Sequence, residues 1–295
     1  MALTVRPLHP VFAAEVTGLD LREPPGEAIR REIDAVMNRY AVAVLRDQFI
    51  NDEQQVRFTR LFGEPEIAPM ERGRTLVPGA HDRIQLPQIF DNSNLDLRGA
   101  LLALDDRRRT YSVANQLWHT DSSFRQLSAT YSMLSARELP PRGADTEFAD
   151  MRAAYDALSE ATKARLEGLV AEHSIWHSRS KLGGYVPNAE ERAARPPAQH
   201  RLVRVHPGSG RKTLYIANHV SHILGLSKDE SDALVDGLLA HATERRFVYA
   251  HQWRPGDLVI WDNRATMHRA TPFEDGDYRR DMRRTTVREA VAEVV

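Results

Sequence analysis

The chain has 295 residues, 42% of them hydrophobic, and a formal net charge of −1, so it can bury a sizeable core but carries no basic field that would favour nucleic acid. It contains no cysteine, which excludes disulfides, thiolate metal sites and cysteine nucleophiles. No apolar run has the length of a membrane span, and the N-terminus lacks a basic segment followed by an apolar core. We therefore expect a cytoplasmic protein that binds neither nucleic acid nor a membrane.

The front of the chain alternates short apolar segments with segments of helical period. The helical segments place apolar residues on one face, and an Asn-Asp pair at 51–52 is a good helix start. The pattern predicts, in order, strands over 3–8 and 12–21, a helix over about 26–39, a buried strand over 41–45 and a helix from about 51 to 61.

Residues 64–114 have the least regular pattern, because four prolines interrupt it. A long irregular stretch inside a compact domain is uncommon and often forms a lid or a binding loop. This stretch runs directly into the segment Asn115–Phe124, so we expect it to be a lid. Within it, the charge run Asp105–Arg109 is interpreted as a solvated loop and not as a binding patch. A second loop is expected around 178–199, where glycines, prolines and charges gather.

The rest of the chain contains short apolar strands separated by Gly/Pro turns, a spacing typical of an antiparallel double sheet. Helices lie between some of these strands. We therefore predict an α+β protein with a double-stranded β-helix (jelly-roll) core and flanking helices. The expected strands cover 131–136, 144–149, 202–205, 213–217, 247–251 and 257–261, and the expected helices 151–158, 159–171 and 227–243.

The segment Asn115–Phe124 contains the tripeptide His119-Thr-Asp121 and has no helical period. On a strand, His119 and Asp121 would point to the same side with Thr120 pointing away, so they could supply two adjacent metal ligands. A second histidine would complete the two-histidine, one-carboxylate set of non-haem Fe(II) oxygenases. Alone the tripeptide is weak evidence, because the chain has 12 histidines and 41 acidic residues; the alternative is an ordinary polar strand end.

A second histidine and a group of arginines follow the strand expected at 257–261. His268 lies one short connection beyond that strand, and Arg280, Met282 and Arg284 share a face if the following segment is extended. Two guanidiniums beside a metal need anionic partners, which points to an anionic cosubstrate and an anionic substrate. The alternatives are a surface histidine and a solvated basic strand. The co-occurrence of all three features favours a site.

These segments together resemble the Fe(II)/2-oxoglutarate dioxygenases of the taurine dioxygenase family, and the likeness spans nearly the whole chain. The resemblance rests on His119-Thr-Asp121, Gly143–Phe148, Trp261-Asp-Asn-Arg through His268, and the arginines from Arg279 to Arg284. Further similar segments lie at 7–14, 115–124, 131–136, 150–158 and 208–212. The resemblance implies that residues 1–295 form a single dioxygenase domain. It also implies, by analogy with often oligomeric relatives, a homo-oligomer.

The resemblance also implies roles for individual residues. His119, Asp121 and His268 would bind Fe(II), and Thr146 and Arg280 would bind the distal carboxylate of 2-oxoglutarate, with Arg279 left as the alternative to Arg280. Two further positions would serve the substrate: Arg284 would meet its acidic group, and Asn115 would line its pocket. Ala68 stands where the family has a taurine-contacting histidine. The roles of His206 and His219 stay open.

The implied reaction is the hydroxylation of a small anionic aromatic substrate by dioxygen. For an aryloxyacetate such as 2,4-dichlorophenoxyacetate, the products would be a phenol, glyoxylate, succinate and carbon dioxide, with ascorbate sustaining activity as a reductant. The same chemistry on a sulfonate, an alkyl sulfate or an aryloxypropanoate is an alternative. So is a non-catalytic jelly-roll protein that binds metal or ligand. A zinc hydrolase is disfavoured, because the ligand set contains a carboxylate and no general-base motif is present.

Overall fold

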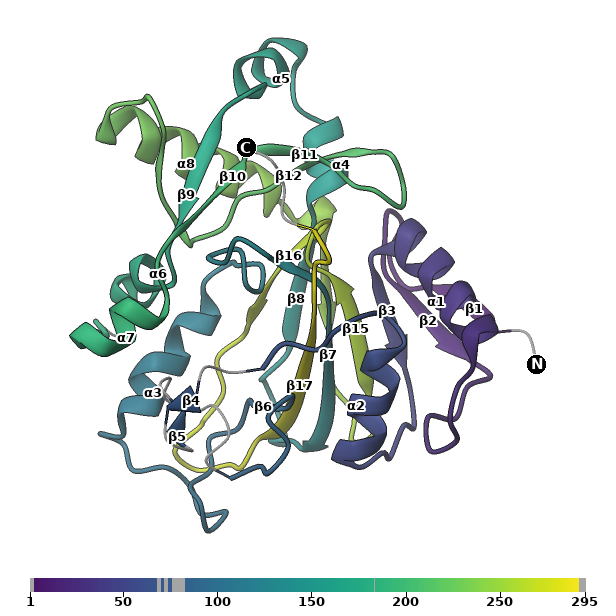
Figure 1. Ribbon diagram of the computed structural model, residues 1–295. Coiled ribbons are helices and arrows are strands. Elements are labelled where there is room, and N and C mark those ends of the chain that lie inside the picture. The colour runs from purple at the N-terminus through teal and green to yellow at the C-terminus, as the bar shows by residue number, and fades with distance from the viewer. Residues whose placement is uncertain (1–2, 68–69, 72–73, 76–82, 183, 292–295) are drawn as a thin grey trace.

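The structure is a computed structural model that describes residues 3–67, 70–71, 74–75, 83–182 and 184–291. Two β-sheets lie at its centre, and helices cover their outer sides (Figure 1). Among these described residues, no helix is long and apolar enough to cross a membrane.

The larger sheet has seven strands, all antiparallel to their neighbours except for the parallel second and third. In spatial order they are β1 (Thr4–Pro7), β2 (Ala14–Thr17), β3 (Val42–Leu45), β15 (Leu258–Asp262), β7 (Ala129–Glu138), β17 (Asp281–Arg288) and β6 (Phe90–Asp91).

The smaller central sheet consists of β14 (Val248–His251), β8 (Thr146–Asp150) and β16 (Thr266–Ala270), with β8 in the middle. Apolar side chains from both sheets meet between them: the ring of Phe148 on β8 lies 5.6 Å from that of Trp261 on β15, and Met282 on β17 belongs to the same buried cluster. The predicted α+β class, with a jelly-roll core and flanking helices, is confirmed.

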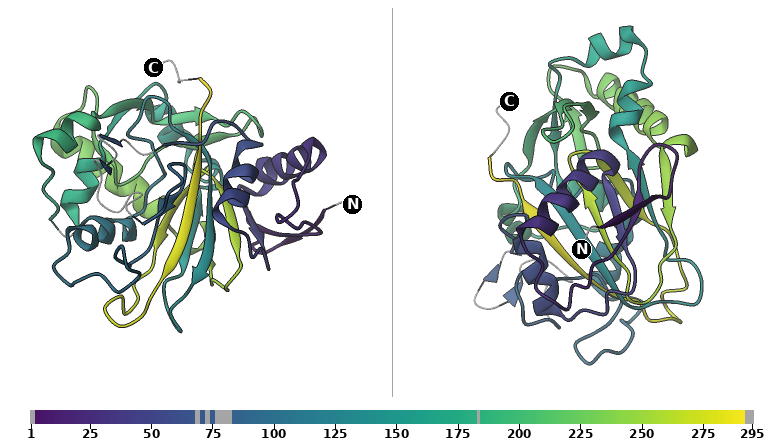
Figure 2. Two further views of the ribbon diagram at one scale, coloured as in Figure 1. Left: turned by 60° about the horizontal axis from the view of Figure 1, so that its bottom comes forward. Right: turned by 90° about the vertical axis from the view of Figure 1, so that its right-hand side faces the viewer.

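Helices and smaller sheets cover this core, with the first two helices beside the N-terminal strands (Figure 2). The helices are α1 (Glu27–Tyr40), α2 (Asp52–Arg60), α3 (Arg107–Ser112), η1 (Val113–Gln116), α4 (Met151–Asp156), α5 (Glu160–Leu166), α6 (Ile175–Lys181), α7 (Ala189–Ala194), α8 (Lys228–Ala242) and η2 (Arg245–Phe247). The outer strands are β9 (Val170–His173), β10 (Ala198–Arg201) and β13 (Val220–Ile223) in one sheet, β11 (Val203–Val205) and β12 (Lys212–Leu214) in another, and β4 (Met70–Glu71) and β5 (Arg74–Thr75) in a third.

Helix α2 supports the two strands that carry polar residues into the centre. A capping box between Asn51 and Gln54 fixes its start. The fully buried amide of Gln55 donates to the carbonyl of Arg283 on β17 at 3.0 Å and accepts from the hydroxyl of Ser135 on β7 at 2.7 Å. A buried amide with both ends bonded holds these strands in one register.

Between residues 159 and 199, two segments differ from the prediction. The helix expected over 159–171 ends at Leu166, because Gly168 has φ +78° and turns the chain into β9. The loop expected around 178–199 contains the end of α6, all of α7 and the start of β10. Helix α7 has its own capping box between Asn188 and Glu191, a start signal that lay within the charges of that segment.

The structure describes only part of the stretch 64–114. Its described residues form β4, β5, β6 and α3 within largely irregular chain. Residues 68–69, 72–73 and 76–82 lie outside the described residues, so the lid stays a prediction, and so does any role for Ala68. The charge run was wrongly interpreted as a solvated loop: Asp106 caps α3, and Arg109 pairs with Asp275 at 2.7 Å.

A buried ion-pair network at the end of β15 gives a prediction about stability. The fully buried carboxylate of Asp262 accepts from Arg264 at 2.6 Å and from Nε2 of His206 at 2.9 Å. Burial alone would raise the pKa of Asp262, but Arg264 and His206 outweigh it and hold that pKa below its ordinary value. Asp262→Asn is expected to lower the free energy of unfolding at pH 7 by about 2–3 kcal/mol, measured by urea unfolding.

The same network sets the pH dependence of that loss. A carboxylate whose pKa is depressed in the folded state stabilises the protein above its ordinary pKa of about 4, and this contribution is lost as the pH falls below that value. The difference between wild type and Asp262→Asn should therefore shrink between pH 5 and pH 3. Asp236→Ala, on the exposed side of α8, is the control. A pH-independent difference would contradict the assigned ionisation.

Candidate metal centre and the cavities beside it

The two histidines of the predicted metal set are paired directly through their backbones. His119 N–H donates to the carbonyl of His268 at 2.9 Å, and His268 N–H donates to that of His119 at 2.7 Å. The predicted strand through His119 is therefore wrong: this is an isolated bridge, followed by a turn in which Ser122 has φ +57°. His268 lies one short connection beyond β15, as expected, and belongs to the next strand, β16.

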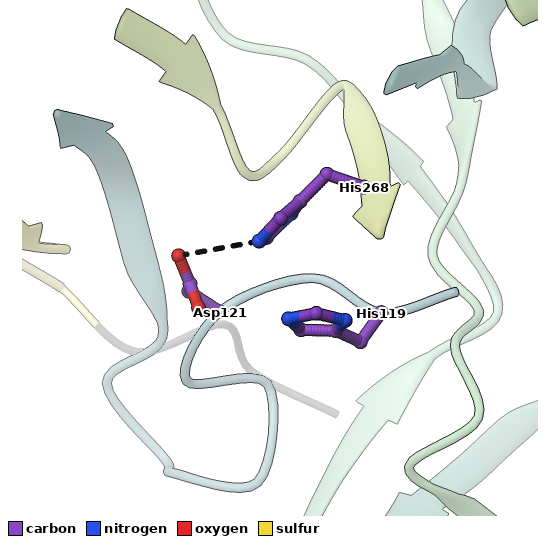
Figure 3. Close-up of side chains that lie close together, drawn as sticks. All are labelled: His119, Asp121 and His268. Carbon is purple, nitrogen blue, oxygen red and sulfur yellow. Dashed lines mark ion pairs between the residues drawn. The ribbon is translucent and has the colours of Figure 1, made fainter. Parts of the chain in front are cut away.

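The turn brings Asp121 back beside both imidazoles (Figure 3). Its backbone N–H donates to Oδ1 of Asn263 at 3.0 Å. Its carboxylate accepts from the hydroxyl of Ser132 on β7 at 2.7 Å and from Nη1 of Arg284 on β17 at 2.5 Å. Thr120 instead donates to the carbonyl of Asn263, at 2.7 Å. Both central sheets therefore contribute to one group of side chains.

His119, Asp121 and His268 form a compact donor set. Each offers one ligand atom within 4.8 Å of the others, and all three side chains are buried. Nε2 of His268 lies 3.8 Å from Oδ2 of Asp121, the contact drawn in Figure 3. Nδ1 of His119 forms a hydrogen bond with the carbonyl of Leu117 at 2.7 Å. In metal-binding histidines, a bond of this kind from the nitrogen that does not face the metal fixes the orientation of the ring.

The protonation states of this group suit a divalent cation. Burial lowers the pKa of His119 to about 4 and holds that of His268 well below its ordinary value, so both imidazoles are neutral at neutral pH. Burial alone would raise the pKa of Asp121, but Arg284, the two histidines and the Ser132 hydroxyl together outweigh it and the pKa falls to about 2. Two neutral imidazoles and one carboxylate are the ligand forms that metal binding requires, and they fit Fe(II).

A cavity opens beside His119 and His268, and Thr146 and Arg280 line it. The indole N–H of Trp253 donates to the hydroxyl of Thr146 at 3.0 Å, which leaves the hydroxyl hydrogen free to donate into the cavity. Nη1 of Arg280 reaches only the carbonyl of Asn92, at 3.4 Å, and no carboxylate in the described part of the chain pairs with it. Burial lowers the pKa of Arg280 to about 10, so it stays charged and needs an anion.

The neighbouring Arg279 lies in a different environment. Its side chain is 45% exposed, pairs with Glu138 at 2.9 Å and donates to the carbonyl of Gly99 at 2.5 Å. It does not line the cavity that Arg280 lines. Of the two candidates, only Arg280 faces the histidines.

Arg284, Asn115 and His119 line both this cavity and a second, neighbouring one. Oδ1 of Asn115 accepts from Nη1 of Arg179 at 2.8 Å. The second cavity is lined by Arg284 and by three arginines that the sequence did not indicate. These are Arg125, Arg179 and Arg195.

The two histidines left open have different places. His206 is enclosed by Asp262 and by Ser209, whose hydroxyl lies 2.8 Å from Nδ1, and it lines neither cavity. His219 lines the second cavity, with its ring centroid 5.8 Å from that of His119 and its Nδ1 2.8 Å from the hydroxyl of Ser178. His206 therefore belongs to a structural network, and His219 belongs to the wall of the site.

Comparisons with known proteins decide the family. The family model described as "Taurine catabolism dioxygenase TauD, TfdA family" matches residues 4–286. The chain belongs to this family. It is 47% identical to the alpha-ketoglutarate-dependent 2,4-dichlorophenoxyacetate dioxygenase of Cupriavidus pinatubonensis, over 97% of this chain and 98% of that protein. It is 37% identical to the (S)-phenoxypropionate/alpha-ketoglutarate-dioxygenase of Sphingobium herbicidovorans, over 92% of this chain and 91% of that protein.

A solved structure agrees with the family in fold and in ligands. The crystal structure of AAD-2 in complex with Mn(II) and N-oxalylglycine covers 100% of both chains, with a TM-score of 0.90 and 43% sequence identity. The predictions of a 2-oxoglutarate-dependent non-haem iron dioxygenase, and of Fe(II) and 2-oxoglutarate as its cofactors, are confirmed for this TauD/TfdA family member. A small-molecule substrate and dioxygen follow from this class of enzyme.

Proposed function

We propose that this TauD/TfdA dioxygenase oxidises aryloxyacetates such as 2,4-dichlorophenoxyacetate. The observation that carries the proposal is that Arg280 and Arg284 line a cavity beside the histidine pair, which provides two positions for anions. The similar dioxygenase of Cupriavidus pinatubonensis, which is named for 2,4-dichlorophenoxyacetate, supports the choice of substrate. The proposal treats residues 1–295 as one dioxygenase domain in the cytoplasm, acting as a homo-oligomer.

In this proposal His119, Asp121 and His268 hold the iron. Bound Fe(II), together with 2-oxoglutarate and dioxygen, supplies the oxidising power that inserts one oxygen atom into a C–H bond while succinate and carbon dioxide form. The protein keeps both imidazoles neutral through burial, and Arg284 keeps Asp121 ionised. Ser132 fixes the carboxylate by donating to Oδ2.

Arg280 and Thr146 bind the distal carboxylate of 2-oxoglutarate. A guanidinium without a carboxylate partner in the described chain can offer its planar fork to that group, and the Thr146 hydroxyl supplies a further donor. Because the wall contains the apolar side chains of Leu134 and Trp261, this charge pair is partly shielded from water. Shielding strengthens the pairing and orients the cosubstrate.

Arg284 meets the acidic group of the substrate, and Asn115 lines its pocket. These residues orient the substrate so that its methylene group, which lies between the ether oxygen and the carboxylate, is the group oxidised. Insertion of oxygen there gives a hemiacetal. The bond between the former methylene carbon and the ether oxygen then breaks as the hydroxyl proton passes to the leaving phenolate oxygen, so the products are a phenol and glyoxylate.

A substrate panel tests the proposal. Succinate formation is followed with purified protein, Fe(II), ascorbate and 2-oxoglutarate, in the presence of 2,4-dichlorophenoxyacetate, an aryloxypropanoate, an alkyl sulfate or taurine. We expect the aryloxyacetate to give the highest kcat/KM. The aryloxypropanoate is the second candidate, because the similar Sphingobium herbicidovorans enzyme is a phenoxypropionate dioxygenase. A preference for taurine or the sulfate would refute the proposed substrate.

Arg284→Ala separates substrate binding from cosubstrate binding. With saturating Fe(II), we expect the KM for the aryloxyacetate to rise roughly 10- to 100-fold, because a charge-assisted pair is lost. The KM for 2-oxoglutarate should change less than about 3-fold, since Arg280 and Thr146 are intact. Steady-state succinate assays give both constants. Equal increases in the two KM values would mean that Arg284 has another role.

A further inference from the structure

The second cavity has an unusual charge distribution. Three carboxylates reach it: Asp121 pairs with Arg284 and Asp91 with Arg83, while Oε2 of Glu66 accepts from the hydroxyl of Ser122 at 2.8 Å and its Oε1 has no partner among the described residues. In contrast, the arginines at 125, 179 and 195 pair with no carboxylate in the described ranges of the chain. The cavity therefore holds more positive than negative charge beside the metal set.

Arg179 on α6 is fixed in place with donors to spare. Arg179 is only 7% exposed. Its Nη1 donates to the carbonyl of Tyr111 at 2.9 Å and to Oδ1 of Asn115 at 2.8 Å. The guanidinium carbon lies 4.1 Å from the centre of the Tyr111 ring. Nε has no hydrogen-bond partner among the described residues. A planar fork held on one side presents its remaining donors in a defined direction.

Arg195, which follows α7, lies on the same tyrosine. It is 8% exposed, its Nη1 donates to the hydroxyl of Tyr111 at 3.3 Å, and its Nε is also without a partner among the described residues. Burial lowers the pKa of Arg195, and the neighbouring charges of Arg125 and Arg179 lower it further, against the opposing effects of Tyr111 and Glu66. A buried guanidinium without a carboxylate partner gains more free energy from pairing with an anion than a solvated guanidinium does.

We propose that Arg179 and Arg195 determine substrate specificity: together with Arg284 they bind the carboxylate of the substrate in the second cavity. This inference rests on the proposed function and identifies the residues that recognise its acidic group. Asn115 is then a positioning residue, because its amide oxygen holds Nη1 of Arg179. The expected ligand is a small monoanion with a planar carboxylate, because a guanidinium fork binds that group bidentately.

Binding calorimetry tests this role without turnover. Protein loaded with Mn(II) and N-oxalylglycine is titrated with 2,4-dichlorophenoxyacetate and, separately, with its neutral amide. In Arg179→Met and in Arg195→Met, we expect the Kd for the acid to rise roughly 10- to 100-fold and the Kd for the amide to change less than about 3-fold. Arg22→Met, at an exposed arginine paired with Asp20, is the matched control and should change neither.

Further variants and probes keep the outcomes distinct. Arg179→Lys retains the charge but loses the fork, so its Kd for the acid should lie between wild type and Arg179→Met, and a thermal melt of each variant checks folding. An unchanged Kd for the acid in both methionine variants, or equal weakening of acid and amide, would overturn the inference.

Hexyl sulfate is titrated in parallel. Arginine-dependent binding of the sulfate but not of the acid would support the anion site and refute the aryloxyacetate substrate. Wild type that binds N-oxalylglycine but none of these anions would overturn the anion site.

Discussion

Asp121→Ala is expected to abolish dioxygenase activity, with a loss of at least about 10³-fold. Asp121 supplies the one anionic ligand atom of the His119/Asp121/His268 set, and mutation of residues that only orient metal ligands already costs about 10- to 100-fold. The variant also leaves the guanidinium of Arg284 without its carboxylate partner. Succinate formation and the iron content per chain after desalting should both fall to background.

Asp236→Ala, at an exposed position on α8, is the control and should keep wild-type activity and iron content. A thermal melt of Asp121→Ala separates loss of metal from loss of fold. Full iron occupancy and turnover in a folded Asp121→Ala protein would remove this residue from the metal centre.

Arg280→Met is expected to raise the KM for 2-oxoglutarate roughly 10²- to 10³-fold. Truncating one partner of a buried charge pair costs about 2–5 kcal/mol, because the other charge is left unpaired in a shielded site. The neighbouring Arg279→Met is a matched control: its guanidinium is half exposed, pairs with Glu138 and does not line the cavity. Arg279→Met should change the KM less than about 2-fold.

Steady-state succinate assays with varied 2-oxoglutarate compare the two variants. The reverse pattern, with a large effect at Arg279 and a small one at Arg280, would assign the cosubstrate carboxylate to Arg279. Calorimetric titration with N-oxalylglycine gives the same comparison without turnover.

Local sequence patterns correctly predicted the elements in which the spacing of apolar residues defines the buried face. The buried strand around 41–45, the helices now seen as α1 and α2, and the strand β15 all lie where alternation or helical period placed them. The helix expected to run to 171 did not, because a single glycine at 168 adopts a left-handed conformation, and period alone does not indicate where such a turn falls.

The metal set was predicted for a partly wrong structural reason. His119 and Asp121 were expected to share the face of a strand, whereas a backbone bridge to His268 and a tight turn bring them together. The spacing of the motif carried the resemblance, but the sequence could not show that Asn263 and Ser132 hold the turn and the carboxylate. Those contacts join segments more than ten residues apart, which local patterns do not encode.

The arginines of the second cavity could not be predicted. Arg179 and Arg195 lay in a segment interpreted as a loop, where charges usually face solvent. They are buried because α6 and α7 pack them onto Tyr111, and that contact joins residues 68 and 84 positions apart. The capping box at Asn188 was the one local signal that this segment is ordered. Arg109 was missed for a related reason, since its partner Asp275 lies 166 positions away.

The most direct test of the account is the stoichiometry of the reaction with 2,4-dichlorophenoxyacetate. Purified protein with Fe(II), ascorbate and 2-oxoglutarate is incubated with this compound in air, and 2,4-dichlorophenol and succinate are quantified in the same samples. The account predicts equal amounts of phenol and succinate, and neither product in Asp121→Ala. Succinate without phenol would contradict the proposed substrate while keeping the dioxygenase. Phenol without 2-oxoglutarate consumption would contradict the reaction itself.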